Sequence, residues 1–200
     1  MDNEIRFKKE LFGDFIEIVL YDIDELLGKP ILDDAYNEAL RLQNIFNFFD
    51  KKSELSILNL KRDLIVSDDL HYVISKALKL SEITKGNYDI TLGKNILQRK
   101  KGENISIIGG SYKDVKVECK RIILNKKDLL IDLGSIAKGY ITDKIAEFLK
   151  LHGIEEGMID SRGDILLFGD YEPIIEIQDP RDKDKSVCKV NLPVPRAQGI

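Results

Sequence analysis

The chain has 200 residues, of which 43% are hydrophobic and 33% are charged. This length fits a domain of about 100–200 residues, so we expect one soluble domain over residues 1–200 and exclude a large multi-domain assembly. The 31 Lys and Arg residues are outnumbered by 35 Asp and Glu, and the net charge of −4 gives no basic field that would favour nucleic acid.

The N-terminal ten residues begin acidic and lack the apolar core of a signal peptide. No apolar run approaches the ~18–20 residues of a membrane span. We therefore expect a cytoplasmic protein without a membrane span. Cys119 and Cys188 are far apart and have no zinc-like spacing, so both are interpreted as reduced structural cysteines.

The first half of the chain predicts mainly helices. Residues 14–23 are rich in β-branched and aromatic side chains and predict a strand, followed by a loop at Gly28-Lys29-Pro30. Apolar residues then recur at helical spacing over residues 31–49. A short helix or ordered loop is expected over 53–59, and a second long helix starts at Ser67 and stops near Gly86.

The second half predicts mainly strands. One long helix is expected over residues 135–151, and the charged run 179–186 is interpreted as a solvated loop. Since helices gather early and strands late, the sequence favours an α+β fold with a mixed, largely antiparallel sheet and packed helices. Short strands are expected at 115–117, 121–124, 129–132, 157–160, 164–168 and 173–177.

The segment from Leu130 to Asp143 is the most informative part of the sequence. An apolar run ends in Asp132, turns through Gly134 and enters a helix at Ser135, which presents free N–H groups and a positive dipole end. Lys138 in the first turn favours a nearby anion. A plainly capped helix explains the same pattern equally well. The glycine spacing matches neither a Walker loop nor Gly-x-Gly-x-x-Gly.

The run Asp132-Leu-Gly-Ser-Ile-Ala-Lys-Gly-Tyr140 resembles the Asp-Leu-Gly-Gly-Ile-Ala-Lys-Gly-Tyr segment of the ApbE family of flavin transferases, which move FMN from FAD to a threonine of another protein. Four further segments match in family order: Phe12-Gly-Asp14, Ser53-Glu-Leu-Ser-x-x-Asn59, Thr84-x-Gly-x-Tyr-Asp89-Ile-Thr91 and Gly163-Asp164-Ile165.

The resemblance implies an ApbE-like (T-fold-like) domain, FAD and Mg²⁺ as cofactors, and an acceptor protein carrying the threonine as partner. Asp132 and Lys138 would be catalytic and would contact FAD, and Ser135 would lie at the metal. The remaining residues that the resemblance assigns to FAD binding are Phe12, Phe49, Asn59, Asn87, Tyr88 and Asp89.

These residues also have plain structural interpretations. Phe49 ends an amphipathic helix and would more often be core, while Asn59 and Asn87 are ordinary cap or turn residues. Asp89 could cap the turn at Thr91. The two histidines lie near helix ends and are expected to be structural.

Three departures from the family pattern keep other hypotheses open. Phe12 and Asp14 replace the ends of a Met-Gly-Thr motif, and Arg162 replaces the first residue of Gly-Gly-Asp. The third departure is that the 200 residues are expected not to include the family's C-terminal metal segment, His-Ile-x-Asp-Pro followed by Asp-x-x-x-Thr. The alternatives are a degenerate homologue that binds flavin or a partner without transfer, and an interaction module that could form a homo-oligomer.

Overall fold

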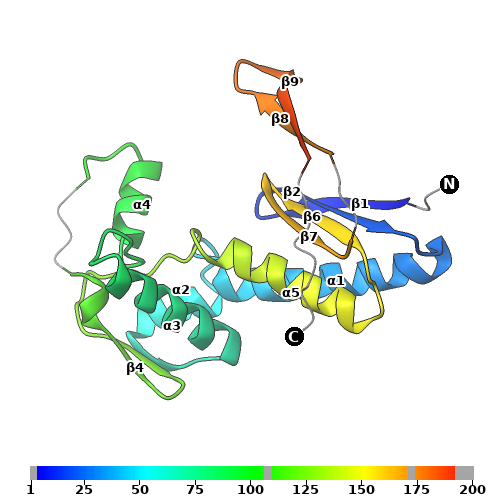
Figure 1. Ribbon diagram of the computed structural model, residues 1–200. Coiled ribbons are helices and arrows are strands. Elements are labelled where there is room, and N and C mark those ends of the chain that lie inside the picture. The colour runs from blue at the N-terminus through cyan, green and yellow to red at the C-terminus, as the bar shows by residue number, and fades with distance from the viewer. Residues whose placement is uncertain (1–3, 106–109, 171–173, 192–200) are drawn as a thin grey trace. The chain divides into compact units, whose positions relative to one another are not determined.

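The computed structural model describes residues 4–105, 110–170 and 174–191, and its elements are drawn in Figure 1. The chain divides into two compact units, one formed by residues 1–36 with 142–200 and the other by residues 37–141. The sequence predicts that both units belong to one domain over residues 1–200, and this stays a prediction.

The first unit contains a four-stranded antiparallel sheet in the order β1-β2-β6-β7. Its strands are β1 (Glu4–Leu11), β2 (Asp14–Tyr21), β6 (Gly157–Ser161) and β7 (Asp164–Phe168). Ile16, Ile18 and Leu20 of the inner strand β2 are fully buried at alternate positions on one face of the sheet, and Val19 between them is buried on the other face. This sheet supplies the core of the unit.

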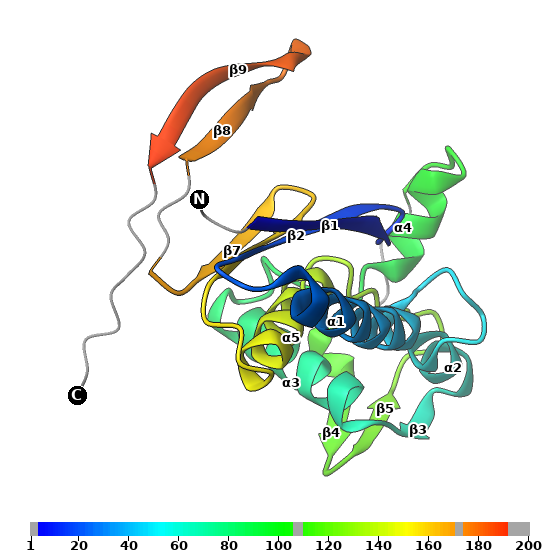
Figure 2. The same ribbon diagram turned by 90° about the vertical axis from the view of Figure 1, so that its right-hand side faces the viewer.

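Helix α1 (Glu25–Phe46) covers the buried face of this sheet with its first turns, as Figure 2 shows. The Tyr36 hydroxyl donates to the Glu10 carbonyl oxygen at 2.6 Å, and the Lys9 ammonium pairs with Asp33 at 2.7 Å. The last turns of α5 (Ala137–Leu151) lie on the same face, where the hydroxyls of Thr142 and Ser161 are 2.7 Å apart.

Two tight hairpin turns end strands of this sheet. Phe12 and Gly13 between β1 and β2 have φ of 58° and 71°, and Arg162 and Gly163 between β6 and β7 have φ of 60° and 86°. Two consecutive positive φ values are typical of the type I′ turn, in which a bulky first residue is unfavourable. Arg162 also pairs with Asp14 at 3.0 Å, so the two turns are joined by an ion pair.

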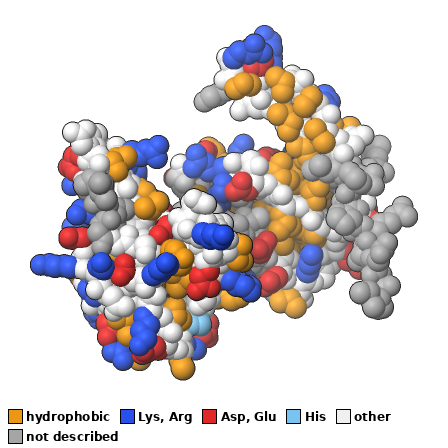
Figure 3. Space-filling view, turned by 60° about the vertical axis from the view of Figure 1, so that its left-hand side comes forward, with side chains coloured by type: hydrophobic (Ala, Val, Ile, Leu, Met, Phe, Trp, Pro, Cys, Tyr) orange, Lys and Arg blue, Asp and Glu red, His pale blue; other side chains and the backbone are white. Residues whose placement is uncertain are grey.

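A separate hairpin is formed by β8 (Ile174–Asp179) and β9 (Asp182–Asn191). Figure 3 shows hydrophobic side chains along it. Ile174, Ile177 and Val187 are 61%, 45% and 52% exposed. The charged run 179–186 was expected to be a loop and that expectation is wrong, because Asp179 pairs with Asp182 and the chain turns back directly into β9.

The second unit holds a three-stranded antiparallel sheet and short helices. The sheet order is β3-β5-β4, with β3 (Asp63–Ile65), β4 (Val115–Glu118) and β5 (Arg121–Leu124). The helices are α2 (Glu54–Lys61), α3 (Asp68–Ile83), α4 (Gly93–Lys100) and the 3₁₀ turn η1 (Tyr112–Asp114). All paired strands in both units are antiparallel, so the predicted α+β class with largely antiparallel sheets is confirmed.

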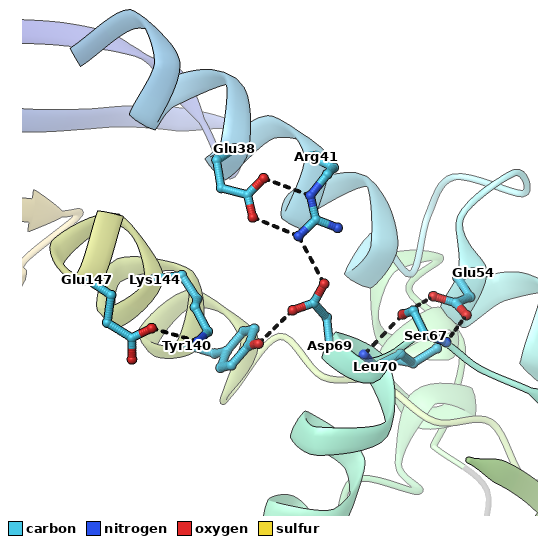
Figure 4. Close-up of polar contacts among 9 residues, drawn as sticks. All are labelled: Glu38, Arg41, Glu54, Ser67, Asp69, Leu70, Tyr140, Lys144 and Glu147. Carbon is cyan, nitrogen blue, oxygen red and sulfur yellow. Dashed lines mark hydrogen bonds and ion pairs between the residues drawn. The ribbon is translucent and has the colours of Figure 1, made fainter. Parts of the chain in front are cut away.

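Helix α3 starts at a fully satisfied cap. The Ser67 hydroxyl accepts from the Leu70 N–H at 3.3 Å and donates to Glu54, whose carboxylate also accepts from the Ser67 N–H at 2.6 Å. Figure 4 shows this cap. The Glu54 side chain therefore ties the start of α2 to the start of α3.

We expect Ser67→Ala to lower the free energy of unfolding by about 1–2 kcal/mol, because the cap is lost and Glu54 loses one of two donors. The measurement is the urea midpoint of the variant against wild type. Ser67→Thr keeps the hydroxyl and should retain most of the stability. Equal midpoints for Ser67→Ala and wild type would show that the cap contributes nothing.

Two other expectations differ from the structure. Gly28 and Pro30 lie inside α1 and not in a loop, since Asp24 caps the helix through its carboxylate bond to the Leu26 N–H at 2.8 Å. Pro30 is the sixth residue of α1, in the second turn, where its missing N–H removes one helical hydrogen bond. Residues 129–132 make only an isolated bridge from Leu130 to Leu92 and no strand.

Several expected elements are confirmed. The strand at 14–23 is β2, the helices at 53–59 and from Ser67 are α2 and α3, and the helix at 135–151 is α5. Within the described part of the chain, none of the helices has the length and apolar character needed to cross a membrane. Cys119 and Cys188 are free thiols, as expected.

Candidate functional site

Asp132 is held at the point where the chain turns into α5. Its carboxylate accepts a hydrogen bond from the Gly134 N–H at 3.1 Å, and its own N–H donates to the Ile90 carbonyl oxygen at 2.9 Å. Burial raises the pKa of the Asp132 carboxyl, and the Gly134 bond opposes that shift without cancelling it. The carboxylate is therefore desolvated, and it binds a proton more readily than an exposed aspartate does.

The Asp132 carboxylate weakens the interpretation of this helix start as an anion site. The Asp132 side chain caps the turn that leads into α5, so a negative group already lies at the positive end of the helix. Lys138 lies half-buried in the first turn of α5. A desolvated carboxylate followed by a lysine can accept a proton at one atom and stabilise a negative charge at the other.

Ser135 and Tyr88 come together although 47 residues separate them. Their hydroxyl oxygens are 3.0 Å apart. Tyr88 is also held through its N–H, which donates to the Thr84 hydroxyl at 3.1 Å. The Thr84–Thr91 segment and the start of α5, two of the segments that match the family pattern, are thus neighbours in the second unit.

The Asp89 carboxylate is used within the protein. One oxygen accepts from the Thr91 N–H at 2.8 Å and the Thr91 hydroxyl at 2.7 Å, and the other accepts from the Tyr112 N–H at 3.0 Å. This arrangement is the turn cap that the plain interpretation predicts, extended to η1. Asn87 beside it is exposed, and its N–H donates to the Thr84 carbonyl at 3.1 Å.

Phe49 and Asn59 have different surroundings. Phe49 is 52% exposed and is not a core residue; its ring contacts Phe48 edge-on and lies 3.4 Å below the Lys100 ammonium. Asn59 is buried, and its carboxamide is bonded to both backbone groups of Ile131. Phe12 belongs to the first unit, in the β1–β2 turn.

Sequence reasoning missed the cluster that holds the start of α5. The Tyr140 hydroxyl donates to Asp69 at 2.7 Å, and the second oxygen of Asp69 accepts from Arg41 at 3.0 Å. Arg41 makes two 2.7 Å bonds to Glu38, as Figure 4 shows. These acidic contacts raise the pKa of the Arg41 guanidinium. In the sequence, Asp69 is recognisable only as an acidic residue in the first turn of a helix, where it stabilises the helix dipole.

The donor set does not by itself fit Mg²⁺. Among the residues that the structure describes, no three His, Cys, Asp or Glu side chains come close enough to hold a metal ion. Ser135 would offer one hydroxyl, which already bonds to Tyr88. Mg²⁺ requires near-octahedral oxygen ligation, which one hydroxyl does not supply.

The fold and this segment define an α+β protein with a desolvated carboxylate just before a helix. A model of the ApbE family matches residues 12–194. The chain therefore belongs to the ApbE family.

Similar curated proteins carry the same function name. The chain is 27% identical over 165 residues to the FAD:protein FMN transferase of Vibrio cholerae, covering 72% of this chain and 49% of that protein. It is 25% identical over 207 residues to the FAD:protein FMN transferase of Buchnera aphidicola, covering 92% and 60%. It spans about half to three-fifths of the length of these relatives.

Solved structures share the fold. The ApbE protein of Thermotoga maritima superposes with a TM-score of 0.82 at 22% identity, covering 96% of this chain and 68% of that chain. The flavin transferase ApbE of Vibrio cholerae, as its H257G mutant, gives a TM-score of 0.78 at 21% identity, covering 89% and 68%. The predicted ApbE-like fold is confirmed.

Proposed function

We propose that this protein is an FAD:protein FMN transferase, which moves FMN from FAD to a threonine hydroxyl of an acceptor protein. The observation that carries the proposal is the desolvated Asp132 carboxylate just before the helix that carries Lys138 in its first turn, in the segment that resembles the family's most extended motif. Membership of the ApbE family and the name shared by the curated relatives support it.

The proposed reaction is a displacement at phosphorus. The threonine oxygen forms a bond to the phosphorus of the FMN half of FAD, the bond from that phosphorus to the bridging oxygen breaks, and AMP leaves with that oxygen. Asp132 would accept the hydroxyl proton, a role suited to a carboxyl whose pKa burial raises. Lys138 would stabilise the charge on the diphosphate.

Flavin binding would use the aromatic and polar residues that the resemblance assigns. Phe49 offers an exposed ring and Tyr88 a hydroxyl beside Ser135, while Asn87 is exposed. Such an aromatic surface suits an isoalloxazine ring. Phe12 in the first unit, the cytoplasmic location and a homo-oligomer stay predictions.

Magnesium assistance is part of the prediction, but the described residues support it only through the Ser135 hydroxyl. Omitting Mg²⁺ from the transfer assay tests whether ligands from elsewhere complete a metal site.

A flavin-binding homologue without transfer activity is the second candidate. The side chains of Asp89 and Asn59 form hydrogen bonds within the protein itself. Arg162 and Asp14, which form an ion pair, stand where the family pattern has other residues. This candidate predicts FAD binding that depends on neither Mg²⁺ nor the Asp132 charge.

The test is incubation of the protein with FAD, Mg²⁺ and an acceptor peptide containing threonine, followed by mass spectrometry of the peptide. The proposal predicts an adduct of one FMN group that is absent when threonine is replaced by valine. FAD binding without any adduct would favour the second candidate and contradict the first.

We expect Gly139→Ala to stabilise the free protein by about 1 kcal/mol, because alanine favours a helix and its Cβ would meet nothing within 4 Å. If the glycine leaves room for the ligand, the same variant should weaken FAD binding. Thermal unfolding and fluorescence titration with FAD measure the two effects. Higher stability with unchanged FAD affinity would show that no ligand approaches Gly139.

A further inference from the structure

The segment from Leu129 to Asp132 is buried at Leu129 and Ile131, and it pairs with no strand in the part of the chain that the structure describes. Leu129 and Ile131 are 1% and 0% exposed, and the only bridge partner of the segment among the described residues is Leu92. Buried backbone N–H and C=O groups need hydrogen-bond partners, because an unpaired one costs the free energy of its lost hydration. The partners of this segment therefore decide how firmly it is held.

Asn59 of α2 takes the place of a strand residue opposite Ile131. Its side-chain amide donates to the Ile131 carbonyl oxygen at 2.8 Å, and its side-chain oxygen accepts from the Ile131 N–H at 2.8 Å. These two bonds repeat the pairing of two residues in an antiparallel sheet. With Asn59 9% exposed, water cannot readily replace either bond.

Arg62 holds the start of the same segment. It ends α2 in the left-handed region with φ of 71°, and its guanidinium donates to the carbonyl oxygens of Lys126 and Leu129. A residue other than glycine in this conformation is uncommon. The next backbone group along, the Leu130 carbonyl, accepts from the Gly93 N–H at 3.0 Å.

We propose that Asn59 and Arg62 are positioning residues that hold the Leu129–Asp132 backbone and thereby fix where the Asp132 side chain lies. Asn59 would then act on the site through Ile131, to which its carboxamide is bonded by both its donor and its acceptor. That the position of Asp132 governs FAD binding rests on the proposed function, whereas the anchoring of the backbone does not.

The test combines amide hydrogen exchange without ligand and titration with FAD, on Asn59→Asp and Arg62→Gln. Asn59→Asp keeps an acceptor for the Ile131 N–H but turns a carboxylate oxygen toward the Ile131 carbonyl. Matched controls at exposed positions are Asn125→Asp, which repeats the Asn-to-Asp change, and Lys61→Gln, which likewise replaces a cation by a neutral amide. Arg62→Gln keeps the proposal testable if Asn59→Asp does not fold.

We expect exchange of the Ile131 and Asp132 amides to accelerate at least about tenfold in both variants, with α3 amides unchanged, because only the local opening becomes easier. FAD affinity should fall at least about tenfold, and the controls should change neither. Equal acceleration in α3 would overturn the proposal, since it marks general destabilisation. Unchanged exchange at Ile131, or local loss with full FAD affinity, would also overturn it.

Failure of the proposed function gives a different result. If the wild-type protein binds no FAD, the proposed function fails, while local loss of protection at Ile131 and Asp132 still supports the anchoring.

Discussion

Asp132→Asn is expected to reduce FMN transfer by about 10²–10⁴-fold, because the amide cannot accept the threonine proton. The same variant should be at least as stable as wild type at pH 7. The side-chain oxygen of asparagine can still accept from the Gly134 N–H. The free-energy cost of burying a charged carboxylate is removed.

The pH dependence of this stability difference has a definite sign. The pKa of Asp132 is raised in the folded protein, so the carboxyl keeps its proton to higher pH when folded than when unfolded. The contribution of Asp132 to stability therefore falls as pH rises from about 3.9, the unfolded value, through its raised folded pKa. The gain in stability of Asp132→Asn over wild type should be absent below this pH window and complete above it.

Urea unfolding of both proteins across that window and a mass-spectrometric transfer assay measure the two effects. Asp34→Asn, the same charge change at an exposed position of α1, is the control and should leave both unchanged. A variant that keeps wild-type transfer would remove Asp132 from the catalytic proposal, and a loss of stability at pH 7 would contradict the desolvation argument.

Gly93→Ala is expected to lower the free energy of unfolding by about 1–3 kcal/mol. A Cβ at this position would lie 2.7 Å from the Leu130 carbonyl oxygen and 3.0 Å from the Phe48 ring. The Leu130 backbone cannot yield without weakening the Gly93–Leu130 hydrogen bond of 3.0 Å. FAD binding should weaken as well, because a shift of the Leu130 backbone would also move Asp132, two residues further along the chain.

The measurement is the urea midpoint together with FAD titration. Gly139→Ala makes the same change where the Cβ meets nothing; as the control for stability it should be more stable than wild type by about 1 kcal/mol. A Gly93→Ala protein as stable as wild type would show that the Leu92–Gly93 turn tolerates a side chain and does not fix Leu130.

The helices and inner strands could be predicted because local signals agree with the fold. Ser53 and Ser67 followed by apolar periodicity mark α2 and α3, and the β-branched run after Asp14 marks β2. Strand β1 was missed because its charged outward-facing residues, such as Arg6 and Lys8, outnumber the apolar ones. Its identity depends on pairing with β2, which spacing alone does not reveal.

The strand expected at residues 129–132 was wrong for a related reason. The apolar run correctly indicated burial, but whether a buried run is a strand depends on its partners. Here the partners are the Asn59 side chain, the Arg62 side chain and the Gly93 N–H, which come from distant parts of the sequence. No pattern within the segment could indicate them.

The candidate site was predicted in part. The motif located Asp132 and Lys138 next to the start of α5, and Tyr88 lies beside Ser135. Contacts with Asp69 and Arg41, which hold that helix start through Tyr140, are tertiary and left only ordinary helix-end signals in the sequence. Whether Asp89 contacts FAD stays a prediction, although three protein donors already use its carboxylate.

The most direct test of the central claim is to quantify AMP and FMN-modified acceptor in the same reaction with FAD. An FMN transferase predicts one AMP released for each modified threonine, and both products should fall together in Asp132→Asn. AMP and free FMN without modified acceptor, or no AMP at all from FAD that is bound, would contradict the claim.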